Sequence, residues 1–69
     1  MEDNVYKIVE IVGSSHESSD AAIRNAIHRA GQTLQRIGWF EVAETRGHVV
    51  EGEIAHFQVT LKIGFHLVD

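Results

Sequence analysis

The stretch from Ile54 to Leu67 reads IAHFQVTLKIGFHL and alternates between apolar and polar side chains. Every second residue from Ala55 to Leu67 is apolar, and most of the residues between them are polar. Because successive side chains of a β-strand point to opposite faces, this pattern predicts a strand with one buried face. Its length and its apolar face are typical of the central strand of a small sheet.

Two more strands are predicted upstream. The residues from Trp39 to Val50 (WFEVAETRGHVV) form a long strand, joined to the last one by a turn at Glu51-Gly52. The segment from Val5 to Val12 (VYKIVEIV) is rich in β-branched residues and predicts the first strand. Gly13 and the polar residues after it are expected to end that strand.

An amphipathic helix is predicted from Ser19 to about Ile37. Ser18 or Ser19 can cap its first turn, and Gly38 is a natural stop after its last apolar residue. The apolar residues recur at helical spacing and form one stripe: Ala22, Ile23, Ala26, Ile27, Ala30, Leu34 and Ile37.

These elements define the fold class as α+β, in a single domain covering residues 1–69. The order is β-α-β-β, and we expect a three-stranded antiparallel sheet with the helix packed on one face. The strand order should be first, third, second, because the helical crossover leaves a gap that the last strand fills. A twelve-residue strand spans about 40 Å and a helix of roughly 18 residues about 27 Å, so the hairpin tip should project past the helix.

Size and composition favour a protein that associates with copies of itself. A chain of 69 residues buries only about 60% of its unfolded surface, and small scaffolds usually need disulfides, a metal or association. The absence of cysteine excludes disulfides and cysteine-based zinc sites, which leaves association as the expected support.

The same composition argues against several functions. The net charge of -4 is opposite to that of most phosphate-backbone binders, so nucleic acid is not an expected partner. No apolar run is long enough to span a membrane, and the start Met1-Glu2-Asp3-Asn4 is unlike a secretory signal. We therefore expect a cytoplasmic protein without a membrane partner.

Four stretches of the chain resemble the dodecin family. They are VYKIVEIVGSS at residues 5–15, AAIRNAIHRAGQTL at 21–34, WFEVAETRGHV at 39–49 and GEIAHFQVTLKIGFHL at 52–67. None is long by itself, but together they cover nearly the whole chain in the family's order. The resemblance implies a hollow homododecamer, built from trimers, that binds riboflavin or FMN at two-fold contacts between subunits. The family roles it suggests are flavin storage, buffering and protection against flavin photochemistry.

The resemblance also assigns roles to four residues. Trp39 matches a tryptophan that stacks on the isoalloxazine ring, and Gln58 matches a glutamine that hydrogen-bonds the polar edge of that ring. Arg46 matches an arginine near the flavin in bacterial-type members, and Glu44 matches an acidic residue that can contact the ribityl chain. The family pattern thus implies a flavin site made of Trp39, Gln58, Arg46 and Glu44.

Three positions depart from the family pattern. His48 stands where some archaeal relatives carry a carboxylate, so their ligand preference does not transfer to this chain. His66 occupies a position that is basic in some relatives, which leaves the phosphate contacts open. Phe57 replaces a frequent tyrosine, and we expect this change to affect packing.

Considered without the family, these residues leave alternatives open. Trp39 is the only tryptophan and the largest surface for stacking, but ordinary packing at a strand start is also common. Gln58 offers the donor and the acceptor that suit a flavin edge, although solvated strand glutamines are common too. Arg46 could place a cation over the ring, pair with phosphate, or bridge to Glu44 or a neighbouring acid.

The predicted register places a constraint on the site. A two-residue turn at Glu51-Gly52 puts Gln58 opposite Thr45, six residues or about 20 Å along the strand from Trp39. This distance exceeds the length of a flavin ring system. Unless a bulge shifts the pairing, one ring can touch Trp39 and Gln58 only if they belong to different chains. The ligand site is therefore predicted to lie between subunits.

Neither a metal site nor a catalytic centre is predicted. His16, His28 and His48 lie on separate elements, and His56 and His66 are ten residues apart on one strand. The chain has no nucleophile–base motif and no phosphate-binding glycine loop, so we do not expect an enzyme. The alternatives are a flavin-dependent reductase on this scaffold and a structural shell without flavin. The sequence does not decide which flavin binds, or whether coenzyme A or an ion also binds the shell.

Overall fold

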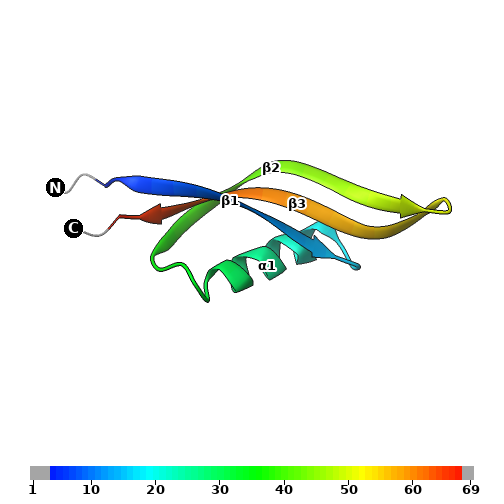
Figure 1. Cartoon of the computed structure of the whole chain (residues 1–69), viewed down its shortest axis with the longest axis horizontal. Helices are drawn as coiled ribbons and strands as arrows, with labels where there is room; N and C mark the ends of the chain where they lie inside the picture. Colours follow the sequence, from blue (N-terminus) through cyan, green and yellow to red (C-terminus); the bar gives the residue numbers. More distant parts are fainter. Residues whose placement is uncertain (1–3, 68–69) are drawn as a thin grey trace.

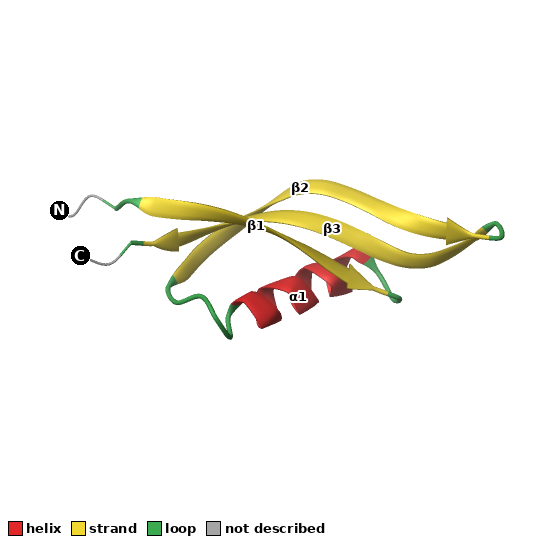
Figure 2. Cartoon of the chain, viewed as in Figure 1, coloured by secondary structure: helices red, strands yellow, loops and turns green. Residues whose placement is uncertain are grey.

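A computed structural model describes residues 4–67 of the chain. These residues form the elements β1 (Tyr6–Ser15), α1 (Ser19–Ala30), β2 (Ile37–Val50) and β3 (Glu53–His66). The strands make one antiparallel sheet in the order β1-β3-β2. Figure 1 and Figure 2 show α1 lying across one face of this sheet. The predicted fold class, element order and strand order are therefore confirmed.

β1 continues past the predicted end at Val12 and includes Gly13, Ser14 and Ser15. The two serines remain paired with β3, so the glycine does not interrupt the strand. Gly13 is buried, and a Cβ placed on it would lie 2.4 Å from the carbonyl oxygen of Ala22. The glycine therefore allows the helix to approach the strand closely, which is a common reason for glycine inside a strand.

α1 begins as predicted but ends earlier than expected. The Ser18 side chain caps its start by accepting a hydrogen bond from the backbone N–H of Ala21 at 3.0 Å. The helix ends at Ala30, and Gly31 rather than Gly38 is its C-cap. Predicting the helix as far as Ile37 was therefore wrong by about two turns.

Burial explains why the helical pattern continued beyond the end of the helix. Leu34 and Ile37 are partly buried and pack against the same apolar core as α1. However, the chain turns after α1 at residues 31–33, Arg36 adopts a positive φ of 63°, and Ile37 then pairs with Phe65 as the first residue of β2. The helical spacing of Leu34 and Ile37 therefore indicated that they are buried, but not that they are helical.

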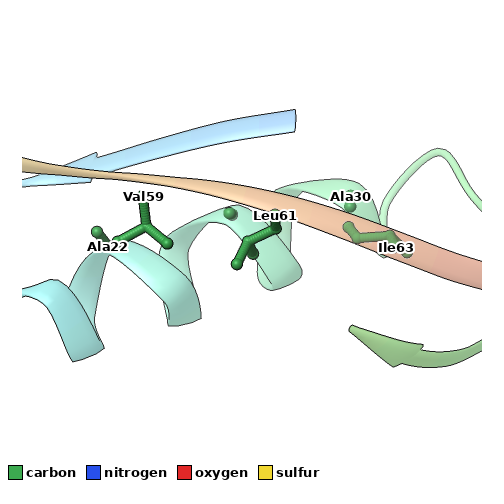
Figure 3. Close-up of a cluster of buried hydrophobic side chains, with 6 residues drawn as sticks. Ala22, Ala30, Val59, Leu61 and Ile63 are labelled. Atoms are coloured by element: carbon green, nitrogen blue, oxygen red, sulfur yellow. The ribbon is translucent and has the colours of Figure 1, made fainter. Parts of the chain in front are cut away.

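The core lies between α1 and the middle of β3, and Figure 3 shows its side chains meeting across this gap. Small helix residues face branched strand residues, and the buried set is Ala22, Ala26, Ala30, Val59, Leu61 and Ile63. The three strand residues are fully inaccessible to solvent. This confirms that the apolar positions in the middle of the last strand face the helix.

The β2–β3 pairing begins at the predicted turn but then shifts at bulges. Val50 pairs with Glu53 across Glu51-Gly52, and Val49 pairs with Ile54. The register is irregular next to Ala55, between Val42 and Glu44, and again at Gly38. As a result Gln58 pairs with Arg46, and its predicted pairing with Thr45 was wrong.

The β2–β3 hairpin projects beyond the helix, as its length predicted (Figure 1). The principal extents of the chain are 54 × 20 × 15 Å. β2 is exposed along almost its whole length, and large apolar side chains on and around it are open to solvent: Phe40, Val42, Val49, Val50 and Ile54. Exposed apolar surface on an edge strand favours association with another chain. No helix among residues 4–67 is long and apolar enough to span a bilayer.

Replacing Gly13 with alanine is expected to destabilise the fold by about 1–3 kcal/mol, because overpacking at a close contact forces backbone shifts. The new Cβ would lie 2.4 Å from the Ala22 carbonyl oxygen and 2.7 Å from the Cβ of Ala26. The measurement is the urea midpoint at equal protein concentration. Gly31→Ala is the matched control, since its Cβ would meet no atom closer than 3.4 Å, and its midpoint should not fall. Equal midpoints for both variants would contradict the close-packing role of Gly13.

Candidate functional site

The face of the sheet opposite α1, called here the outer face, carries all four candidate residues. Val59, Leu61 and Ile63 point toward the helix, so the residues between them in β3 point away from it. Cross-strand partners share a face. Pairing with β3 therefore places five β2 residues on the outer face, namely Trp39, Glu41, Glu44, Arg46 and His48.

Trp39 lies against the backbone of β3 at Gly64, its cross-strand partner. A Cβ on Gly64 would fall within 2.3 Å of two indole carbons, Cε2 and Cζ2, so only glycine leaves room for the ring there. Tyr6 flanks the indole at a centroid distance of 5.9 Å, and His66 contacts Tyr6 at 4.5 Å. Trp39 nevertheless remains 37% exposed. We call this arrangement the indole platform, because it holds an aromatic ring at the surface with one side supported.

A polar network surrounds Arg46 farther along the same face. The Nη1 group of Arg46 donates a hydrogen bond to Oε1 of Gln58 at 3.1 Å. Its Nη2 group donates to Glu44 at 2.5 Å and to the Thr60 hydroxyl at 3.2 Å. Both charged side chains are well exposed, so the ion pair adds at most about 1 kcal/mol to stability. The network orients polar groups on an open surface and contributes little to holding the fold together.

The bulge at Ala43 places the polar network on the same face as the indole platform. Without it, Glu44 and Arg46 would share a face with Val42, because alternate residues of a strand point the same way. Val42 pairs with Leu61 and Glu44 with Thr60, so the extra residue moves Glu44 and Arg46 to the face of Trp39. Bulges commonly redirect side chains in this way.

The indole platform and the polar network are well separated within one chain. Trp39 pairs with Gly64, whereas Arg46 pairs with Gln58, six residues away along β3. Six strand residues span about 20 Å. The structure therefore brings Gln58, Arg46 and Glu44 together and leaves Trp39 apart from them.

Sequence reasoning missed several residues of this face. Among the alternatives for Arg46, the structure shows the bridge to Glu44 and adds Gln58 and Thr60 as partners. The supporting role of Gly64 was also missed, although a glycine in a long apolar strand is a signal of close approach by another group. Thr60 had no comparable signal, since alternation identified its face but not its partner.

Comparisons with known proteins identify the family. The family model described as Dodecin matches residues 5–68. A curated dodecin from Thermus thermophilus is 49% identical over 65 residues, which is 94% of each chain. The chain belongs to the dodecin family.

Solved dodecin structures agree with the fold. The structure of dodecin from Streptomyces davaonensis is 51% identical, with a TM-score of 0.93, and the match covers 99% of this chain and 100% of that one. Dodecin from Streptomyces coelicolor gives the same TM-score at 46% identity, covering 100% and 99%. A calcium dodecin from Mycobacterium tuberculosis is more distant, at 29% identity with a TM-score of 0.80 over 93% and 91% of the two chains.

Proposed function

We propose that this protein binds and stores a flavin, riboflavin or FMN, at sites shared between subunits of a homododecameric shell built from trimers. In each site, Trp39 of one subunit stacks on the isoalloxazine ring. Gln58 orients the polar edge of the ring, Arg46 supplies positive charge, and Glu44 contacts the ribityl chain. Stacking against the indole quenches the excited flavin, so storage and protection against photochemistry arise from the same contact.

The observation that carries this proposal is the division of the outer face into an indole platform and a distant polar network. An isoalloxazine ring has two apolar faces and one edge of alternating carbonyl and N–H groups, so it needs both kinds of contact. Because about 20 Å of strand separates Trp39 from Gln58, one ring system cannot reach both in the same chain. Two copies that meet through their outer faces can supply both contacts.

Membership of the dodecin family supports the ligand and the assembly. The exposed apolar side chains of β2 and the open edge of that strand support association independently of the family. A stacked indole also occupies the ring face that a reducible substrate would need, which favours storage over catalysis. The proposed location is the cytoplasm.

The test is a fluorescence titration of riboflavin and FMN with the purified protein, combined with light scattering to measure its mass. We expect near-complete quenching of the bound flavin and a mass that corresponds to twelve subunits. Incubation with a nicotinamide cofactor should give no steady turnover. Unchanged flavin fluorescence would contradict the flavin proposal and favour a structural shell, whereas sustained turnover would favour a reductase.

A further inference from the structure

Three of the histidines meet where β3 leaves the tip of the hairpin. His48 and His56 are cross-strand partners, and their rings stack with centroids 4.5 Å apart and planes at 29°. The ring of His16, from the loop between β1 and α1, lies 6.2 Å from that of His56. His48 is exposed and His56 is half-buried. Sequence position had separated these residues, and the fold brings them together.

The bulge at Ala55 creates the His48–His56 pair. Val50 pairs with Glu53 and Val49 with Ile54, so an unbroken ladder would place His48 opposite Ala55. Because the ladder skips Ala55, His48 faces His56 on the same side of the sheet. The Ala55 carbonyl lies 3.2 Å from Nδ1 of His16 and can accept a hydrogen bond from it.

We propose that the His48–His56 pair is a two-imidazole site for a divalent transition-metal ion of the zinc, nickel and copper class. Neutral imidazole is the most common protein ligand for these ions. Directly opposed residues of an antiparallel pair have Cβ atoms about 4.5–5.5 Å apart, close enough for one nitrogen from each ring to bind a common ion at about 2.1 Å. Because a metal–imidazole bond lies in the plane of the ring, binding requires the two stacked rings to turn until one nitrogen of each points at the same ion.

The residues around the His48–His56 pair determine which other ligands and charges an ion would meet there. Among the described residues, no group of three or more histidine, aspartate or glutamate side chains is placed to hold one ion, so water completes the coordination. The nearby charge of Arg46 is balanced by its ion pair with Glu44, which reduces repulsion of a cation. His16 remains outside the site, with its ring directed to the Ala55 carbonyl.

The test is calorimetric titration of Zn²⁺ into the assembled, flavin-free protein without an affinity tag. We expect wild-type protein to bind one ion per subunit, and His48→Ala and His56→Ala to bind at least about tenfold more weakly. The matched control is His28→Ala, an exposed histidine on α1 that should leave the affinity unchanged.

Two outcomes would overturn the proposal. One is unchanged zinc affinity in both His48→Ala and His56→Ala, and the other is an equal loss in His28→Ala. Because the titration contains no flavin and neither histidine is one of the four proposed flavin contacts, failure here would leave the flavin proposal standing. Far-ultraviolet circular dichroism and light scattering of each variant show whether the fold and the assembly are retained.

Discussion

Trp39→Ala is expected to weaken flavin binding at least about fivefold and to abolish most of the quenching of bound flavin. Stacking of a planar ring on an aromatic side chain contributes about 1–3 kcal/mol, which corresponds to roughly a 5- to 150-fold change in affinity. The excited flavin also loses the indole that donates an electron to it. The measurement is the titration of riboflavin and FMN fluorescence with the variant and with wild type.

Trp39→Phe is the matched comparison, because it keeps an aromatic face but removes the indole. Its affinity should fall between those of wild type and Trp39→Ala, and its quenching should be weaker than that of wild type. The fold should survive both changes, since Trp39 is 37% exposed and lies outside the buried core. Equal quenching of flavin fluorescence by Trp39→Ala and by wild type would show that Trp39 does not contact the bound flavin.

Gly64→Ala is expected to produce nearly the same loss of flavin binding without changing an aromatic residue. A Cβ at this position would lie 2.2 Å from Cε2 and 2.7 Å from Nε1 of Trp39, so the indole must leave its place on the strand. A displaced indole no longer presents its ring at the proposed stacking position. We expect flavin affinity to fall at least about fivefold, within the energy of one stacking contact.

Two measurements separate displacement of the indole from general unfolding. The near-ultraviolet circular dichroism of Trp39 should change in the flavin-free variant, while the far-ultraviolet spectrum stays that of wild type. Gly31→Ala, whose Cβ meets nothing closer than 3.4 Å, should bind flavin normally. Wild-type affinity in Gly64→Ala would show that the support of the indole by β3 is unimportant for binding.

The elements of the fold could largely be predicted from the sequence because burial leaves a periodic signal. The alternation in Ile54 to Leu67 identified the central strand, and the structure buries Val59, Leu61 and Ile63 completely. The same signal misplaced the end of the helix, since Leu34 and Ile37 are partly buried without being helical. The apolar periodicity indicates which side chains face the core. Both a helix and a non-helical segment packed on the same core can produce it.

The detailed arrangement of the outer face could not be predicted, because it depends on bulges. The bulge at Ala55 pairs Arg46 with Gln58 and His48 with His56, and the bulge at Ala43 places Glu44 and Arg46 on the face of Trp39. A bulge inserts one unpaired residue and reverses the alternation beyond it. Alanine at such a position has no sequence signature that distinguishes it from alanine in a regular strand.

For the proposed site, the separation of Trp39 from Gln58 also has a consequence for how flavin binding depends on protein concentration. In a site divided between two chains, a flavin binds only to associated subunits and so stabilises their association by mass action. Under this proposal, dilution that separates the subunits should lower the apparent flavin affinity, and flavin supplied during assembly should favour completion of the shell. In the proposed homo-oligomer one gene encodes both halves of every site, so one substitution changes every site of the assembly.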